Sequence, residues 1–273
     1  MKKLPLLISY AYRDAFDWGM VKEHRDSLDL LVDSGAFTAY KQGGHISLAE
    51  YCDWLNWLHA EVIEPTNYFT LDVIGNPHAT MRNYAELLKL GYTPVPIFTR
   101  GEHPDYIEEL FQTSPAKDGV VGIGGIQMKT NNSPGYLKMI MKRVGDRNVH
   151  WLGFTVHDFL LHFRPYSADS INWKGTALFG NIKLFYGNKF ITVVKSKLFQ
   201  YRMRILDLGF DPSELADDEA WKGGKGLAHR ISTASYLDYM ATLQERSNVK
   251  IYPVVNNTTE LEVILNAFQR RTT

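Results

Sequence analysis

The segment 68–98, with the sequence YFTLDVIGNPHATMRNYAELLKLGYTPVPIF, contains one complete strand–helix–strand unit. Its first and last parts, 68–72 and 93–98, are short apolar runs rich in aromatic and β-branched residues, which predict buried strands. Between them, Asn76-Pro77 predicts the start of a helix, because proline fits the first helical turn, and Gly91 predicts its end. A helix between two such strands is the connection that parallel strands require.

The same alternation of short apolar runs and helical segments continues along the chain. Helices are predicted over about 47–63, 103–111 and 134–144, and the C-terminal end is predicted as helix 228–245, a short strand 250–255 and helix 258–270. This rhythm predicts an α/β fold, a (β/α)₈ TIM-type barrel forming a single domain over 1–273 with C-terminal helical additions. An open doubly wound sheet is the alternative. The eight predicted strands are 4–9, 30–33, 68–72, 93–98, 119–124, 149–154, 166–169 and 180–186.

Composition narrows the class of protein. With 45% hydrophobic residues the chain of 273 residues has enough apolar material for a large core. The 30 basic and 30 acidic residues balance, which excludes a uniformly basic nucleic-acid binder but leaves room for a local basic patch. The single cysteine, Cys52, excludes an intrachain disulfide and a cysteine-rich zinc site. No run resembles a signal peptide or reaches the length of a membrane span, so we expect a cytoplasmic protein without a membrane partner.

Three predicted strands end in an aspartate: Asp33, Asp72 and Asp169. A single aspartate after a strand often caps a helix or closes a turn. Parallel strands, however, bring their C-terminal ends to one face, where active sites of such folds form. Three carboxylates at equivalent positions therefore predict a shared site in which they shift each other's pKa values and divide the roles of nucleophile and acid. Gly124-Gly125, which ends another strand, predicts either a tight turn or space for a flat ring against the backbone.

At these positions the chain resembles a known family. The stretch Asp33-Ser-Gly-Ala-Phe37 is similar to the Asp-Ser-Gly-Gly-Phe stretch of the tRNA-guanine transglycosylases. Asp72, Gly124-Gly125 and Asp169 follow in the order of that family's base-recognising aspartate, Gly-Gly turn and nucleophilic aspartate. The resemblance covers about residues 30–175. It implies that Asp169 attacks the sugar, that Asp33 transfers the proton, and that the base is bound by Ser34, Gly35, Phe37, Asp72, Gly124 and Gly125.

Two departures from that family bear on the substrate. The tRNA enzymes have a zinc site of three cysteines and one histidine, which a chain with only Cys52 cannot build. Thr99-Arg100-Gly101 stands where the family has a Gln-Gly-Gly loop. A short, zinc-free chain is more similar to the phage-type transglycosylases that act on DNA. The resemblance thus implies exchange of guanine in DNA for a 7-deazaguanine such as preQ0, through a covalent aspartate–deoxyribose intermediate, without metal or cofactor, in a monomer or homodimer. Transfer RNA is the alternative substrate.

A basic and aromatic segment follows the last of these aspartates. Residues 172–206 include seven basic residues and no acidic ones, with aromatic residues interleaved. Such a pattern favours phosphate contacts and stacking on unpaired bases, although core aromatic residues and ordinary surface lysines would give it as well. We therefore predict a nucleic-acid-contacting insertion over 172–230. Its contact residues are expected to be Lys174, Lys183, Lys195, Lys197, Arg202 and Arg204.

Two other functions fit the same residues. A carboxylate-dependent N-glycosidase would remove a base without replacing it, and a non-catalytic barrel would bind nucleic acid and catalyse nothing. The histidines at 150, 157 and 162 do not have the spacing of a helical metal pair, so a structural or surface role is expected for His150, His157 and His162.

Overall fold

The structure is a computed structural model that describes residues 2–126, 133–174, 180–223 and 225–272. The chain forms two compact units. The sheet unit consists of Lys2–Ser170 and Ser247–Asn256, and the hairpin unit consists of Ile171–Arg246 and Asn257–Thr273. The predicted insertion 172–230 falls inside the hairpin unit, which extends beyond it.

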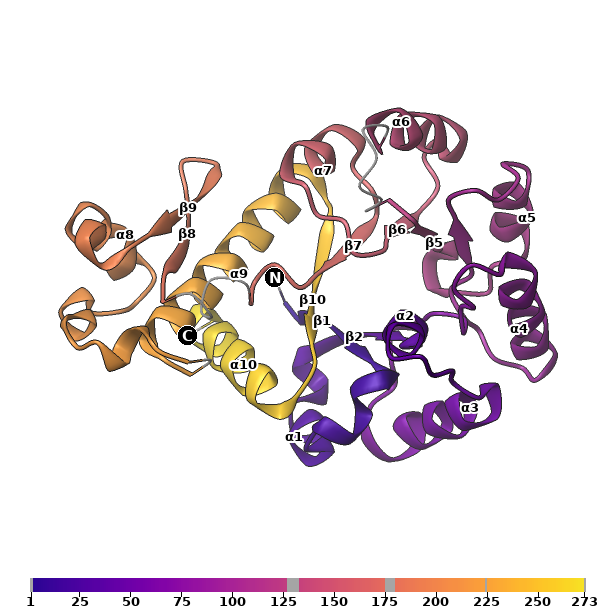
Figure 1. The fold of residues 1–273 in the computed structure, drawn as a ribbon, viewed down its shortest axis with the longest axis horizontal. Coiled ribbons are helices and arrows are strands. Elements are labelled where there is room, and N and C mark those ends of the chain that lie inside the picture. Colours follow the sequence, from indigo (N-terminus) through magenta and orange to yellow (C-terminus); the bar gives the residue numbers. More distant parts are fainter. Residues whose placement is uncertain (1, 127–132, 175–179, 224, 273) are drawn as a thin grey trace. The chain divides into compact units, whose positions relative to one another are not determined.

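The sheet unit contains eight parallel strands in one curled sheet (Figure 1). Their order is β3-β2-β1-β10-β7-β6-β5-β4, so β1 to β3 and β4 to β7 each pair in sequence order, and β10 stands between β7 and β1. The predicted α/β fold with parallel strands is therefore confirmed. The strands are β1 (Leu4–Ser9), β2 (Leu28–Asp33), β3 (Asn67–Tyr68), β4 (Ile97–Thr99), β5 (Val121–Gly124), β6 (Val149–Trp151), β7 (Ser167–Ser170) and β10 (Lys250–Val255).

The predicted barrel is not closed, because β3 and β4 remain the two edges of the sheet. The segments beside these strands meet through one parallel bridge, between Phe69 and Val95. Val95 N–H donates to the carbonyl of Tyr68 at 2.7 Å, and Thr70 N–H donates to the carbonyl of Val95 at 3.0 Å. Prolines at positions 94 and 96 have no N–H to donate, which prevents a longer ladder here. The fold is compatible with a (β/α)₈ arrangement that is open along this seam.

Helices follow most of the strands and lie around the outer side of the curled sheet (Figure 1). The predicted helix after Asn76 is confirmed: the Asn76 side chain accepts a hydrogen bond from Ala79 N–H at 3.1 Å, and Gly91 follows the helix with a φ of 86°. Helices of this unit are α1 (Trp18–Glu23), α2 (Ala36–Lys41), α3 (Leu48–Trp57), α4 (Pro77–Lys89), α5 (Tyr106–Thr113), α6 (Ser133–Val144) and α7 (His157–Phe163).

The inside of the curled sheet is filled by alternate residues of its strands. Leu7, Leu31, Phe69 and Tyr252 belong to one buried cluster. A Cβ atom at Gly122 would lie 3.0 Å from the Phe69 ring, so the absence of a side chain there makes room for that ring. Because side chains alternate along a strand, residues two positions beyond this layer also face inward, at the C-terminal ends of the strands. Those positions include Asp33 in β2 and the glycine at 124 in β5.

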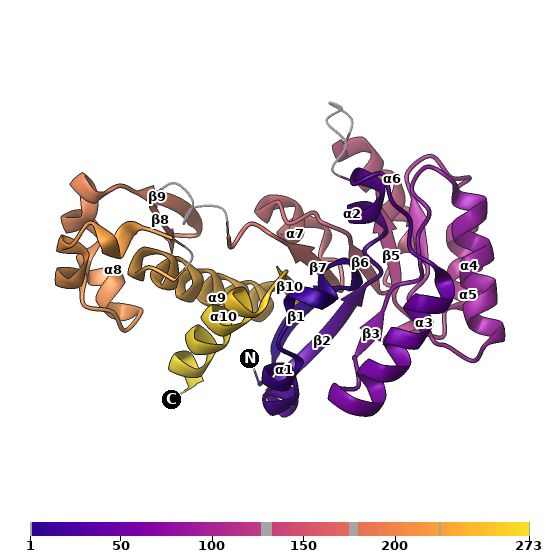
Figure 2. The ribbon, with the colours of Figure 1, turned by 60° about the horizontal axis from the view of Figure 1, so that its bottom comes forward.

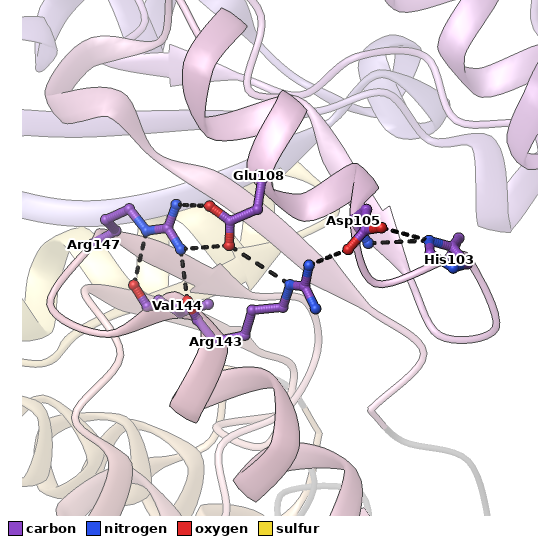
Figure 3. A network of polar contacts seen from close by, with 6 residues as sticks. All are labelled: His103, Asp105, Glu108, Arg143, Val144 and Arg147. Atoms are coloured by element: carbon purple, nitrogen blue, oxygen red, sulfur yellow. Dashed lines mark hydrogen bonds and ion pairs between the residues drawn. The ribbon is translucent and has the colours of Figure 1, made fainter.

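An ion-pair network ties α5 to α6 on the outside of the sheet unit (Figure 3). Arg147 donates two hydrogen bonds to the Glu108 carboxylate, at 2.6 and 3.0 Å. Arg143 bonds Asp105 and lies 3.6 Å from Glu108. The Arg147 guanidinium lowers the pKa of Glu108. These residues lie on or next to α5 and α6 and hold the two outer helices together.

The hairpin unit is built on β8 (Ile182–Tyr186) and β9 (Lys189–Val193), which pair antiparallel. The prediction that 180–186 forms the eighth strand of the barrel is wrong, and β10 has that place. The reason is the turn Gly187-Asn188, whose φ values of 58° and 64° suit a two-residue hairpin. The other helices of the unit are α8 (Arg202–Asp207), α9 (Leu227–Ser247) and α10 (Thr258–Thr272), seen with the hairpin in Figure 2. None of the helices among the described residues could cross a membrane.

Candidate active site

Asp33 ends β2 and is held by two donors on the same oxygen. Its Oδ2 accepts a hydrogen bond from Ser9 Oγ at 2.8 Å and another from Gly35 N–H at 2.9 Å. Gly35 has a φ of 77°, and a Cβ atom there would lie 2.6 Å from the backbone nitrogen of Ala11. Only glycine fits this turn without displacing the backbone that holds the carboxylate.

Burial raises the pKa of Asp33, and the charges of Asp169 and Asp72 raise it further, against the two hydrogen bonds, which lower it. The strands β2, β3 and β7 belong to one parallel sheet, and Asp33, Asp72 and Asp169 lie at or after the C-terminal ends of these strands, on the same edge of the sheet. The sequence-based prediction that they meet at one face of the sheet therefore agrees with the structure. Their catalytic and binding roles stay predictions.

Asp169 lies at the end of β7 and is 9% exposed. Its Oδ1 accepts a hydrogen bond from Gly153 N–H at 2.7 Å, and Nε2 of His150 lies 3.1 Å from the same oxygen. His150 is 1% exposed, and its Nδ1 lies 2.8 Å from Ser167 Oγ. The aspartate is therefore anchored through one oxygen by a backbone amide and an imidazole.

Asp72 follows β3 and is bound to the first turns of α4. Its Oδ1 accepts a hydrogen bond from Thr80 Oγ1 at 2.6 Å, and Thr80 Oγ1 in turn accepts one from Val73 N–H at 2.9 Å. Glu102, a residue that sequence reasoning missed, adds a fourth carboxylate in the loop after β4, where it accepts a hydrogen bond from Thr99 N–H. Burial raises the pKa of Glu102, and the charge of Asp72 raises it further.

The two glycines after β5 differ in their surroundings. Gly125 has a φ of 73°, and a Cβ atom there would lie 2.7 Å from Arg100 Cβ, so this residue is required by the turn. A Cβ atom at Gly124 would have Thr99 Oγ1 at 3.4 Å and Leu152 Cδ1 at 3.7 Å, which is ordinary contact or slightly closer. A methyl group would therefore fit at Gly124 in ordinary contact with its neighbours, so glycine is not required there by the packing.

The remaining predicted base-binding residues differ in exposure. Ser34 is 1% exposed, which places its side chain in the interior. Phe37, in α2, is 55% exposed, and the ammonium of Lys41 lies 4.4 Å from its ring centre. Phe37 can reach a ligand as it stands, whereas Ser34 contributes to packing beside Asp33.

Several basic side chains of the segment 172–206 are paired with carboxylates of the hairpin unit. Three of the six predicted contact residues have carboxylate partners: Lys174 with Glu260 at 2.6 Å, Lys195 with Asp218 at 2.6 Å, and Arg204 with Asp238 at 2.5 Å. These carboxylates lie beyond residue 206 in the chain, outside the stretch in which acidic residues are absent.

The other three predicted contact residues differ in how far they are buried. Lys183 is partly buried, and burial lowers its pKa. Lys197 and Arg202 are exposed, and no ion pair joins either of them to the described residues. The guanidinium of Arg202 lies 3.9 Å from the ring centre of Phe199, which is 76% exposed. Lys197, Arg202 and Phe199 are the members of the predicted surface that remain open to a ligand.

Two hollows in the surface of the sheet unit lie away from these aspartates. One is bordered by Leu55, Tyr68 and Tyr92, and the other by Lys3, Arg25 and Glu61 near the N-terminal ends of the strands. Neither includes Asp33, Asp72 or Asp169. Within the described part of the chain, no group of three or more His, Cys, Asp or Glu side chains is arranged to hold a metal ion.

Comparison with models of protein families, with curated proteins and with solved structures found no match to this chain. The resemblance to the transglycosylases therefore depends on the sequence motifs quoted above.

Proposed function

We propose that this protein is a base-exchange transglycosylase that replaces guanine in DNA with a 7-deazaguanine such as preQ0. The observation that carries the proposal is the pair Asp33 and Asp169, two neighbouring carboxyl groups in different surroundings. Burial raises the pKa of Asp33, and Asp169 is anchored through Oδ1 by Gly153 N–H and His150 Nε2, which leaves its Oδ2 for the sugar. Acid-assisted cleavage of a glycosidic bond uses two carboxyl groups, one that gives a proton and one that attacks the sugar.

In the first half of the proposed reaction, Asp169 attacks C1′ of the deoxyribose. The bond between C1′ and N9 of guanine breaks, its electron pair leaves with the base, and the departing guanine takes the proton of Asp33. Positive charge that develops on the sugar ring in the transition state is stabilised by the Asp169 carboxylate. The products are a covalent ester between Asp169 and C1′, free guanine and an ionised Asp33.

In the second half, the incoming 7-deazaguanine occupies the place that guanine left. The Asp33 carboxylate takes the N9 proton of that base, N9 bonds to C1′, and Asp169 leaves as a carboxylate. The cycle restores both aspartates to their starting states, so no cofactor is consumed. A guanine-like ring has donors at N1 and at the 2-amino group, which can bond to the Asp72 carboxylate, and Phe37 offers an aromatic face for the ring.

The substrate base must leave its helical stack to reach these carboxyl groups. We propose that Lys197 and Arg202 bind phosphates of the flanking strand and that Phe199 stacks on an unpaired base. This surface is smaller than six basic residues would give, because Lys174, Lys195 and Arg204 already have carboxylate partners.

The proposal is tested by incubating the full chain with duplex DNA, single-stranded DNA or tRNA, each with preQ0 and related bases, and analysing the nucleosides by mass spectrometry. Modified deoxyguanosine positions in DNA, absent with Asp169→Asn, would support it. Modification of tRNA and not of DNA would mean that tRNA is the substrate. Release of guanine without incorporation would identify an N-glycosidase, and binding of DNA without either reaction would leave a non-catalytic module.

A further inference from the structure

We propose that His150 is a positioning residue that, with Gly153, holds Oδ1 of Asp169 so that Oδ2 is the atom that bonds to the sugar. This inference rests on the proposed function for the identity of the reaction. The hydrogen-bond arrangement itself is independent of it. Both donors bind the same oxygen: Gly153 N–H at 2.7 Å and His150 Nε2 at 3.1 Å. Among the described residues, none donates to Oδ2.

The state of the imidazole follows from its two partners. A carboxylate has no hydrogen to give, so Nε2 carries the hydrogen that bonds Asp169. In the neutral ring Nδ1 is then an acceptor, and the Ser167 hydroxyl at 2.8 Å donates to it. Ser167 is 2% exposed, so water does not compete for this bond. The chain Ser167–His150–Asp169 fixes the tautomer and the plane of the ring.

No other charged group is needed to explain the ring's orientation. The Phe69 ring lies 5.1 Å from His150 on the side of β3, and the Tyr252 ring lies 6.1 Å away on the side of β10. The Tyr252 hydroxyl bonds Asp29 instead, at 3.2 Å. The charged group bonded to the imidazole is Asp169, whose Oδ1 lies 3.1 Å from Nε2.

Two donors on Oδ1 affect both halves of the reaction. In the ester, Oδ1 is the carbonyl oxygen, and it becomes part of a carboxylate again when the sugar leaves. Donors at this atom stabilise the charge that returns to Asp169, as donors in an oxyanion hole do. They also prevent rotation that would exchange the two oxygens, which keeps Oδ2 directed at C1′.

The test compares wild type with His150→Phe, His150→Gln, Ser167→Ala and a control, His162→Gln, which changes a histidine on α7. We expect His150→Phe to lower kcat about 10²–10³-fold, the usual effect of removing one such donor, with little change in KM for DNA or base. His150→Gln restores part of the rate, because its amide nitrogen can donate near the position of Nε2. His162→Gln behaves as wild type. A His150→Phe variant with wild-type kcat would overturn the assignment.

A second measurement does not depend on activity. Nitrogen-15 NMR of the imidazoles in the substrate-free protein should give His150 in the Nε2–H form, and Ser167→Ala should reduce that preference while circular dichroism stays unchanged. A ring with its hydrogen on Nδ1 would overturn the proposal even if exchange occurs. If wild type catalyses no exchange but the Nε2–H form is found and responds to Ser167→Ala, the proposed function fails and the hydrogen-bonded arrangement stands.

Discussion

The ends of β2 and β7 present the same residue type in two different surroundings. Asp33 and Asp169 each use one oxygen to accept a backbone N–H and one side-chain donor. The side-chain donor is a neutral hydroxyl at Asp33 and an imidazole at Asp169. Burial and two neighbouring carboxylates raise the pKa of Asp33. The strand ends place the two acids at the same edge of the sheet. The groups bonded to each acid differ, and under the proposed function this difference separates the proton donor from the nucleophile.

The largest effect is expected at Asp169. Asp169→Asn keeps an oxygen to accept from Gly153 but removes the nucleophile, so exchange should fall on the order of 10⁴-fold or more. Covalent trapping on denaturing gels, with DNA that contains the target guanine, should show an adduct with wild type and none with the variant. An adduct that persists in Asp169→Asn would mean that the roles of the two aspartates are reversed.

Asp33→Asn should lower the exchange rate about 10²–10⁴-fold, the usual contribution of a general acid. Covalent trapping distinguishes Asp33→Asn from Asp169→Asn. In Asp33→Asn the nucleophile Asp169 is intact, so it can still attack a substrate whose leaving group needs no proton. Single-turnover measurements with such an activated base should recover adduct formation in Asp33→Asn. Equal loss with both kinds of leaving group would remove the acid role from Asp33.

The same substitution should stabilise the fold, which Asp169→Asn is not expected to do. A carboxyl group whose pKa is higher in the folded than in the unfolded chain favours folding at low pH, and this contribution is lost as pH rises through the folded pKa. Above that pH, wild type holds a buried charge that Asn does not have. We expect Asp33→Asn to gain about 0.5–2 kcal/mol near neutral pH and less in acid, measured by urea unfolding. A gain that grows in acid would contradict the raised pKa.

A smaller and more specific change is expected for Ser9→Ala. The Ser9 hydroxyl lowers the pKa of Asp33, so its removal should raise that pKa and extend activity to higher pH. The loss of the hydrogen bond should cost about 0.5–1.5 kcal/mol of stability. The pH dependence of kcat for Ser9→Ala, compared with Ser167→Ala near the other aspartate, measures this effect. A descending limb that moves to lower pH would contradict the assignment of the proton to Asp33.

The smallest effects are expected in the hairpin unit. Lys197→Ala and Arg202→Ala should each weaken DNA binding modestly and reduce the slope of log K against log salt by about 1. Lys195→Ala is the matched control, because its ammonium is already paired with Asp218. Fluorescence anisotropy at several salt concentrations measures both quantities. If Lys197→Ala, Arg202→Ala and Lys195→Ala weaken DNA binding equally, ion pairing does not decide which residues contact DNA.

Local sequence signals account for much of the fold. The bounds of β1 and β10 and the start of α4 agree with prediction, because apolar runs and an Asn-Pro start are encoded within a few residues. The role of β10 does not follow from such signals. Strand 180–186 and strand 250–255 look alike locally, and only the Gly187-Asn188 turn assigns the first to a hairpin.

The candidate site was predictable only where it depends on strand ends. Asp33, Asp72 and Asp169 each follow an apolar run, so their common location could be inferred. Ser9 and His150 could not be assigned, because their roles depend on which face of a strand turns inward and on which strand lies beside it. A structural or surface role is expected for His150, and the structure places it in β6, buried beside Asp169.

The seam at Val95 has a consequence for motion. Two backbone hydrogen bonds and the contact of the Tyr68 hydroxyl with Thr93 join the two sides there, which is less than a strand ladder, so amide exchange should begin at Val95 and Thr70 before it reaches the ladders of β1, β2 and β10. Asp72 lies just past this link on one side, and Glu102 lies beyond β4 on the other. Transient parting of the seam would therefore widen the gap between those two acids while leaving the distance from Asp33 to Asp169 unaltered. Opening of the seam would therefore change the surroundings of Asp72 more than those of Asp33 and Asp169.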